Sequence, residues 1–418
     1  MAGKHPEVFH LANGMRVLYH RLSHSRLVHC GIMVNAGSRH EQPSENGIAH
    51  LLEHGVFKGT RQRRPYHILS RMENVGGEVD AYTSRDKTGY TTTAPSRYAG
   101  RALDLLTDML FQPTFPEREI QKEKQVVREE LELYEDTPEE SLMDDFHSFQ
   151  YPDQPLGYNI LGTRESLEAL SPADLRRFHQ QHYQPQNMVV AIVGRVTPRR
   201  LDQLIRQYLE PIPAGPPQEQ AYPKQRPPVP QQGFQQCINK DFQQTYCMLG
   251  ASAYSRNDPR YYALHVLNAF LGGTDMSARL NLRLREQYGY VYQIDTSYLS
   301  YADTGLFIID FSTDRKNHER CLSLIHQELE KIRRQPPGKV QLNRAKRQLL
   351  GQASMLEEDP PALMQDMAYN LLNQGKVQSY EAYAANINAV QADELSAVAA
   401  KLFDPDQISQ LTYMPGSE

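Results

Sequence analysis

The sequence predicts an α+β protein made of two duplicated layered domains, each an antiparallel-rich sheet with helices packed on one face. Three observations predict this fold. Strand-like segments are followed by pairs of long amphipathic helices, a proline-rich segment divides the chain near its midpoint, and the two halves repeat the same order of elements. Groups of strands followed by groups of helices are typical of layered α+β domains.

The elements of the first half are short apolar or threonine-rich runs and two longer helical patterns. Residues 31–36, 90–93 and 188–194 combine apolar and β-branched residues between turn signals, which is typical of strands. Residues 99–112 and 117–134 have apolar residues at helical spacing and predict consecutive helices. The first half is therefore expected to be one sheet with helices packed against it.

The boundary between the halves is marked by residues 210–232. This segment holds eight prolines and no apolar periodicity, as an extended and fairly stiff linker does. We therefore expect a domain at residues 1–209, a linker at 210–232 and a second domain at 233–418.

The second half repeats the pattern of the first. Residues 244–274 run from a strand through a polar turn into a helix that ends at a Gly-Thr pair, as residues 27–60 do. Farther on, each half has a charged helix that leads to acidic residues and proline, at 134–138 and 356–361. The offsets are 214 and 223 residues (274 − 60 and 359 − 136), which predicts one duplication with insertions. Other predicted elements of this half are a strand and two helices at 306–311, 316–333 and 337–357.

Composition argues against several classes of protein. The 45 basic and 50 acidic residues give a net charge of −5, which argues against nucleic acid held by bulk charge. No apolar run approaches the roughly 20 residues of a membrane helix, and the first twenty residues lack the apolar part of a secretory signal. The four cysteines have neither metal-clip nor disulfide-framework spacing. We expect a cytoplasmic protein that binds neither membrane nor nucleic acid.

Residues 50–54 carry the strongest chemical signal. His50 and His54 are four residues apart, so on a helix both imidazoles project from one face, as two ligands of one tetrahedral metal require. Glu53 lies beside them, close enough to act on a water without being a ligand. Two histidines and a carboxylate with an open fourth position are typical of a catalytic zinc site. Two surface histidines on a solvated helix are the alternative, but the apolar flanks predict a buried helix.

A third ligand is expected on the acidic helix at residues 122–133. Glu123 and Glu130 are seven residues apart, almost two full turns, and share a helix face. Glu129 and Glu132 point about 100° and about 200° away from that face. Taken alone, a fully solvated run of charges stays the commoner interpretation of such a helix.

These motifs resemble the pitrilysin/insulinase family of metallopeptidases, the inverzincins. His50-Leu51-Leu52-Glu53-His54 is followed 76 residues later by Glu130, which resembles the zinc signature of the family, and Glu123 matches a further family acid. The resemblance covers nearly the whole chain. Other matching segments are residues 34–39, 58–60, 76–84, 134–138, 161–167, 183–188, 271–273 and 284–292.

The resemblance implies a zinc-dependent endopeptidase with one Zn²⁺ per chain. His50, His54 and Glu130 would be its ligands. Glu53 would take a proton from the attacking water and pass it to the leaving amine. Glu123 would lie behind the ligands and orient either Glu130 or the substrate.

The resemblance also implies how the substrate is held. The strand formed by Asp80, Ala81, Tyr82 and Thr83 would add an extended substrate to its edge. Asp80 departs from the family pattern, which usually has Asn at this position.

The second half carries no zinc motif and is expected to contribute differently. Where the first half has its ligands, the second has His265 and Ala353 in place of a complete set. In the family, an Arg/Tyr pair of the metal-free half binds the substrate carbonyl, where a cation and a phenol can stabilise an oxyanion. Arg285 and Tyr292 match this pair, and the alternative register is Arg283 and Tyr290.

Two-domain chains of this length in the family pair into a clamshell around a chamber. The resemblance therefore implies a homodimer with composite active sites, which acts on unfolded peptides or small polypeptides. A heterodimer with a second subunit stays open. The alternative function is a catalytically silent scaffold or partner subunit. Such a subunit is expected to lack part of the ligand set, which is intact here.

Overall fold

The computed structural model describes residues 5–215, 227–273 and 276–416, so residues 216–226 of the predicted linker lie outside the described residues. The chain forms two compact units. The first comprises, among the described residues, 5–132, 158–215 and 356–379, and the remaining segments form the second. These units differ from the predicted halves because a segment of each half belongs to the unit built mainly from the other half.

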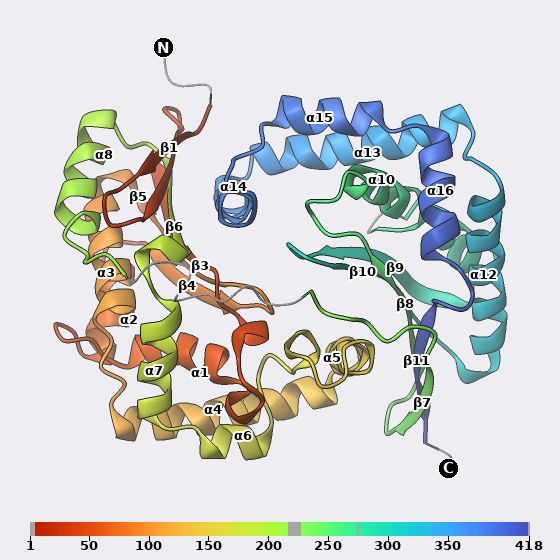
Figure 1. Cartoon of the computed structure of the whole chain (residues 1–418), viewed down its shortest axis with the longest axis horizontal. Helices are drawn as coiled ribbons and strands as arrows, with labels where there is room; N and C mark the ends of the chain where they lie inside the picture. Colours follow the sequence, from red (N-terminus) through yellow and green to blue (C-terminus); the bar gives the residue numbers. More distant parts are fainter. Residues whose placement is uncertain (1–4, 216–226, 274–275, 417–418) are drawn as a thin grey trace. The chain divides into compact units, whose positions relative to one another are not determined.

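The first unit contains a six-stranded sheet (Figure 1). Its strands are β1 (Glu7–His10), β2 (Arg16–Arg21), β3 (Leu27–Val34), β4 (Glu78–Thr83), β5 (Thr88–Pro95) and β6 (Met188–Gly194). Their order is β1-β2-β6-β3-β5-β4. β2 and β6 are parallel and all other neighbours are antiparallel. The predicted strands at 31–36, 90–93 and 188–194 correspond to β3, β5 and β6.

Helices of the same half cover one face of this sheet. They are α1 (Ile48–Gly55), α2 (Pro65–Glu73), α3 (Ala99–Phe111), α4 (Glu117–Asp136), α6 (Arg164–Ala169), α7 (Pro172–His182) and α8 (Pro198–Leu204). Alternate side chains of β3, such as Val28, Cys30 and Ile32, join their apolar residues in one core. This alternation follows from the period of two along a strand.

The second unit contains a five-stranded sheet with the strands β7 (Gln235–Lys240), β8 (Thr245–Ala253), β9 (Val291–Ser300), β10 (Gly305–Thr313) and β11 (Ser409–Pro415). Their order, β7-β11-β8-β10-β9, repeats that of β2-β6-β3-β5-β4, with one parallel pair at the same place. The common order supports the predicted duplication, with β1 as an additional strand of the first copy.

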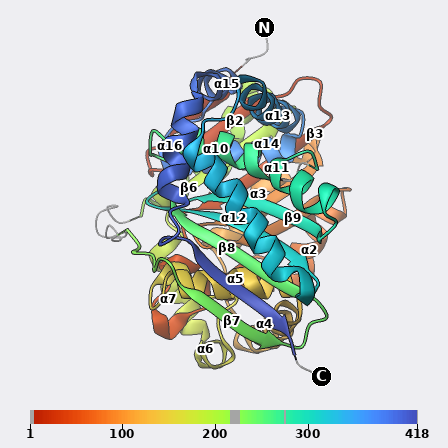
Figure 2. The ribbon, with the colours of Figure 1, turned by 90° about the vertical axis from the view of Figure 1, so that its right-hand side faces the viewer.

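Helices of the second half cover one face of the second sheet. They are α10 (Tyr261–Leu271), α11 (Arg279–Asn281), α12 (His318–Arg334), α13 (Lys339–Glu357), α15 (Tyr380–Ala389) and α16 (Ala392–Leu402). Figure 2 shows α12 lying across the strands of this sheet. Cys321 and Ile325 of α12 share a core with Cys247 and Leu249 of β8.

The remaining face of each sheet is covered by a helix from the other half of the chain. In the first unit, α14 (Pro360–Gln374) packs Leu363, Met364 and Leu371 against a face that includes Leu18, Met33 and Val189. A Cβ added to Gly31 would lie 2.9 Å from Met364 Cε, so this glycine gives α14 its close approach to β3.

The second sheet receives α5 (Pro138–Gln150) in the same way. Phe146 of α5 packs with Met248, Leu306 and Tyr413, and a Cβ on Gly250 would lie 2.3 Å from its Cζ atom. The α+β class is confirmed, but the prediction of a single covered face is corrected for both sheets. In the first sheet, all seven residues of β6 are buried. A strand that is covered on both faces has a continuous apolar sequence, as β6 does.

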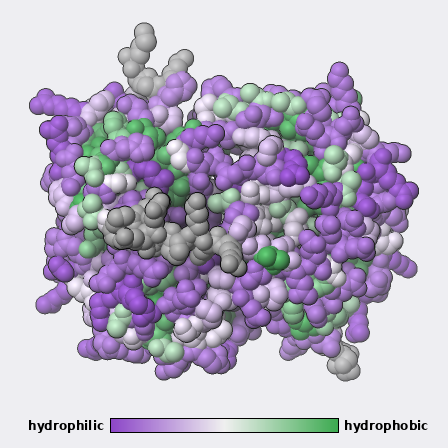
Figure 3. Space-filling view, viewed as in Figure 1, coloured by the Kyte–Doolittle hydropathy of each residue, from purple (hydrophilic) through white to green (hydrophobic). Residues whose placement is uncertain are grey.

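None of the helices in the described residues is both long and apolar enough to cross a membrane. On the face drawn in Figure 3, hydrophilic residues predominate and hydrophobic ones gather in separate groups. Apolar groups on a mostly polar surface are normal for a folded protein.

Candidate active site and metal centre

The helix α1 is buried along most of its length, and a buried carboxylate satisfies its first turn. Glu41 accepts hydrogen bonds from the backbone N–H groups of Gly47 (2.8 Å) and Ala49 (2.9 Å) and from Asn46 Nδ2 (2.9 Å). Burial raises the pKa of Glu41 to about 8, although these hydrogen bonds act in the opposite direction. The contacts fix the start of the helix, because its first N–H groups have no partner within the helix.

Three predicted ligands converge between α1 and α4. His50 Nε2 and His54 Nε2 lie 3.8 Å and 3.7 Å from Glu130 Oε2. One potential ligand atom of each residue lies within 4.8 Å of the others. Within the described parts of the chain, this is the one group of His, Cys, Asp or Glu side chains that is spaced to hold a metal ion.

The burial and the lowered pKa of His50 are those expected of a metal ligand. The residue is 7% exposed, its Nδ1 has no hydrogen-bond partner in the described structure, and its Nε2 is too far from Glu130 for a hydrogen bond. Burial lowers the pKa of His50 to about 3, so the imidazole is neutral and has a lone pair to give. A buried polar ring without partners is costly. A cation between the two Nε2 atoms and the Glu130 carboxylate would give His50 Nε2 a partner, and this donor set suits zinc.

Glu123 contacts the Nδ1 side of the His54 ring. Its Oε2 lies 3.1 Å from His54 Nδ1, and its Oε1 lies 2.8 Å from Lys58 Nζ. Burial acts to raise the pKa of Glu123, but its contacts with His54 and Lys58 lower it overall. In the neutral imidazole, a proton on Nδ1 that faces Glu123 leaves the lone pair of Nε2 directed toward the metal position. The predicted role of Glu123, orienting Glu130 or the substrate, stays a prediction. The observed contact places the carboxylate where it can orient His54.

Glu53 lies on the same helix and is only 8% exposed. Its Oε2 accepts a hydrogen bond of 2.6 Å from the Thr83 hydroxyl. Burial raises the pKa of Glu53 to about 7, with smaller contributions from neighbouring acids. A carboxylate whose pKa lies near neutrality can both take and return a proton.

The predicted substrate strand is an edge strand of the first sheet. Within the described residues β4 pairs only with β5, and α1 packs beside it. Asp80 is exposed, and Ala81, Tyr82 and Thr83 are half-buried. Because Thr83 reaches Glu53, the open edge of β4 ends beside the candidate base.

Arg285 and Tyr292 lie together in the second unit. Arg285 belongs to the π-helical segment η8 (Leu282–Gln287), and Tyr292 is the second residue of β9. The guanidinium carbon of Arg285 is 5.8 Å from the centre of the Tyr292 ring. Tyr292 is 80% exposed, so its phenol is available to another molecule.

The alternative pair has other partners. Arg283 donates to Gln287 Oε1 (2.5 Å) and lies 3.8 Å from Glu328. Tyr290 stacks on Tyr288 with ring centres 5.3 Å apart. Arg285 and Tyr292 thus lie beside each other, whereas Arg283 and Tyr290 contact other side chains, and the choice between the two pairs stays a prediction. His265 packs edge-on against Tyr261 and Tyr298, as expected for a structural histidine.

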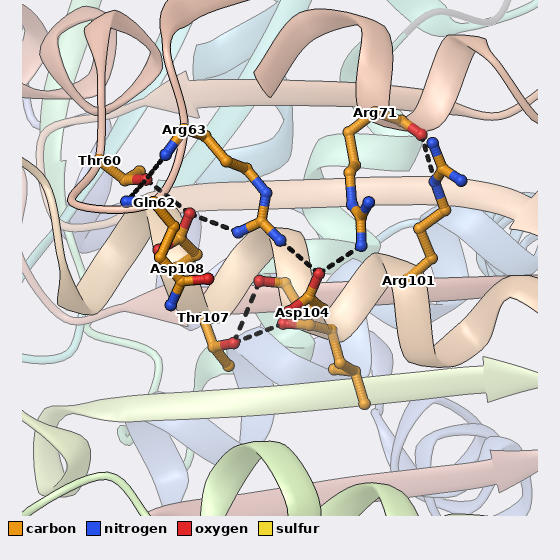
Figure 4. A network of polar contacts seen from close by, with 9 residues as sticks. Thr60, Gln62, Arg63, Arg71, Arg101, Asp104, Thr107 and Asp108 are labelled. Carbon is orange, nitrogen blue, oxygen red and sulfur yellow. Dashed lines mark hydrogen bonds and ion pairs between the residues drawn. The ribbon is translucent and has the colours of Figure 1, made fainter. Parts of the chain in front are cut away.

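A polar network holds the loop that follows α1 (Figure 4). The Thr60 hydroxyl donates to Asp108 (2.6 Å), which is only 3% exposed. Arg63 contacts both Asp108 and Asp104, and Arg71 Nη2 donates to Asp104 (2.6 Å). The network ties the loop after α1 to α2 and α3. The spacing of sequence motifs could not predict this network, because only the folded structure brings its residues together.

Comparison with known families gives two adjacent matches. Residues 16–164 match the family model described as insulinase (peptidase family M16), and residues 169–349 match the model of the peptidase M16 inactive domain. The first match contains His50, Glu53, His54 and Glu130, and the second contains Arg285 and Tyr292.

Individual relatives cover nearly the full chain. The uncharacterized zinc protease YmxG of Bacillus subtilis is 31% identical over 97% of both chains. An uncharacterized zinc protease of Streptomyces coelicolor is 32% identical over 93% of this chain and 85% of its own. Among solved structures, a protease from Helicobacter pylori has a TM-score of 0.91 at 22% identity and covers 98% of this chain and 100% of its own. A peptidase M16 inactive domain from Pseudomonas fluorescens has a TM-score of 0.90 at 21% identity over 99% of this chain and 98% of that chain. These two likenesses concern the fold.

Proposed function

This chain belongs to the insulinase family of peptidases, peptidase family M16, and from that premise we propose that it is a zinc-dependent endopeptidase. One observation carries the proposal. The two Nε2 atoms of His50 and His54 face the Oε2 atom of Glu130, with the carboxylate of Glu53 on the same buried helix. Two relatives that cover most of the chain are named as zinc proteases, which supports the proposal.

The residues of the first unit divide the work of peptide hydrolysis. When bound, zinc would supply a Lewis acid for the scissile carbonyl and the attacking water. Glu53 takes the proton of that water and delivers it to the leaving amine. Glu123 holds His54 in the orientation that directs Nε2 to the metal position. The buried setting of α1 keeps these groups in place before substrate arrives.

The substrate is proposed to be an extended segment of an unfolded peptide or small polypeptide. The open edge of β4 offers backbone N–H and C=O groups to an added strand. Such pairing reads the backbone and needs an unfolded segment, so a folded protein would be a poor substrate. Arg285 and Tyr292 are proposed to stabilise the oxyanion.

A catalytically silent family member is the second candidate. The description of the family model that matches residues 169–349, an inactive domain, favours it. That segment lies outside the part of the chain that holds the ligands, and the ligand set of the first unit is complete. The proposal of an active peptidase therefore stands on the first unit.

Metal content and cleavage test both candidates together. Protein stripped with a chelator and reloaded should hold about one zinc per chain and should cleave a quenched-fluorescent unfolded peptide. Less than a tenth of an equivalent of zinc would contradict the metal site. Zinc binding at full stoichiometry without cleavage of any peptide in a diverse library would instead favour the silent alternative.

We also propose a homodimer that encloses a chamber, with each active site shared between subunits. The chain supplies both the zinc ligands and the Arg285/Tyr292 pair, so it can complete the site by self-pairing. In this arrangement the ligands of one subunit meet the Arg/Tyr pair of the other.

Mixing two inactive variants tests the shared site. A His50→Ala subunit should still lend its Arg285 and Tyr292, and an Arg285→Ala subunit should keep its zinc. Co-refolded one to one, about half of the dimers are mixed and each has one complete site. Activity should then return to roughly a quarter of wild type, because the oxyanion contacts act in the transition state. Mixed dimers, seen by mass analysis, that stay inactive would rule out sharing.

A further inference from the structure

Thr83 links the edge strand β4 to the carboxylate of Glu53. It is the last residue of β4, and its Oγ1 lies 2.6 Å from Glu53 Oε2. The β-branched side chain restricts the rotamer of Thr83, so the position of its hydroxyl depends on the backbone of β4. The place of Glu53 is thus set from two sides, by the buried helix that carries it and by the strand edge beside it.

A second hydroxyl, that of Thr88, lies close to Thr83 but directs its own proton elsewhere. Thr88 faces Thr83 across the β4–β5 pair, and their Oγ1 atoms are 3.4 Å apart. Thr88 is fully buried and donates to the carbonyl oxygen of Ala36 at 2.8 Å. A hydroxyl has one proton to donate. An ionised carboxylate only accepts, so the proton of Thr83 is the one that binds Glu53 at 2.6 Å, and Thr88, whose proton lies on Ala36, does not supply it.

The turn after Thr83 holds the strand end in place. The Ser84 N–H donates to the Lys87 carbonyl (2.8 Å), and the Ser84 hydroxyl donates to Asp86 Oδ1 (3.1 Å). The Ser38 N–H in turn donates to the Ser84 carbonyl (3.2 Å). These contacts limit the movement of Thr83, so its hydroxyl stays directed at Glu53.

We propose that Thr83 is the positioning residue of the proton-transfer step. Its hydroxyl donates a hydrogen bond to Glu53 Oε2, which leaves Oε1 to take the proton of the attacking water. The same hydrogen bond links the carboxylate to the edge of β4, where the substrate strand would pair. The proposal rests on the proposed peptidase function. The proton moves from water to Glu53 Oε1 and from there to the leaving amine, while Thr83 keeps its own proton throughout. A hydrogen bond to a charged carboxylate is among the stronger kinds.

Two substitutions separate the hydroxyl from the shape of the side chain. Thr83→Val keeps the β-branched shape and removes the donor, and Thr83→Ser keeps the donor. We expect Thr83→Val to lower kcat by about 10-fold to 100-fold, with KM within about twofold of wild type and zinc content unchanged. Thr83→Ser should restore kcat to within about threefold. Thr91→Val, at a half-buried threonine of β5, is the matched control and should keep wild-type kcat.

Several outcomes would overturn the proposed role of Thr83. A Thr83→Val enzyme that keeps wild-type kcat would overturn the proposal, as would equal losses in Thr83→Val and Thr83→Ser. A rise in KM with unchanged kcat would assign Thr83 to substrate binding alone and would also overturn it. If thermal melting shows that Thr83→Val does not fold, Thr83→Ala takes its place with the same expectation. A wild-type enzyme that binds zinc but cleaves no peptide would contradict the proposed function itself, and is distinguishable from all of these.

Discussion

Replacement of Glu53 by glutamine is expected to leave the zinc content unchanged and to lower turnover by about 100-fold or more. The amide cannot take the proton of the attacking water, whereas the metal ligands His50, His54 and Glu130 are untouched. Its carbonyl oxygen can still accept the hydrogen bond from Thr83, so the local fold should persist. Metal analysis together with kcat on an unfolded peptide checks the result.

Zinc loss in Glu53→Gln would mean that this residue is a ligand and that its assignment as the base is wrong. Full activity would place the proton acceptor elsewhere. A circular-dichroism melt that matches wild type serves as the control for folding, because Glu53 is buried and any gross rearrangement of α1 would lower the melting temperature.

Glu130→Gln should weaken zinc binding by at least about 100-fold, more than the roughly 10-fold to 100-fold typical of a partner behind the ligands. The substitution removes the one anionic ligand of the group, and an amide oxygen binds zinc poorly. A competition titration against a chromophoric chelator gives the affinity, and cleavage should fall in parallel at limiting zinc.

The adjacent residue provides the matched control for Glu130. Glu129 lies on the same helix, is exposed, and accepts a hydrogen bond from Gln125. Glu129→Gln removes the same charge one position away and should leave zinc affinity within about twofold of wild type, because exposed charges contribute little at this range. Equal losses in both variants would show a general charge effect rather than ligation by Glu130.

Periodicity and punctuation predicted most of the local structure. The strands β3, β5 and β6 and the helices α3 and α4 carry apolar residues at the spacing of their type, so each could be predicted in isolation. The placement of α5 and α14, each of which covers the sheet of the other half of the chain, could not be predicted in this way. Both helices have ordinary amphipathic sequences, and nothing local indicates which of two similar sheets they will cover. The uninterrupted apolar run of β6, residues 188–193, was the sequence signal that this sheet has two covered faces.

The candidate site divides in the same way. His50, Glu53 and His54 lie on one helix, so their spacing alone predicts their common face. Glu130 needed the resemblance as well, since its helix has several acids. Glu41, Lys58 and Thr83 were not predicted in their roles, because each acts through a hydrogen bond whose partner is chosen by tertiary packing. Glu41 is an example: it caps a helix that begins seven residues later.

Because α14 lies far along the chain, one face of the first sheet is completed late during synthesis. The last strand of the first sheet ends at Gly194, but the helix that shields Leu18, Met33 and Val189 ends at Gln374, so 180 further residues (374 − 194) separate the two. At a typical 5–20 residues per second, a ribosome needs roughly 10–40 s to make that stretch. For this time the nascent chain carries an apolar sheet face with no partner, which is the kind of surface that chaperones recognise and that aggregates when crowded.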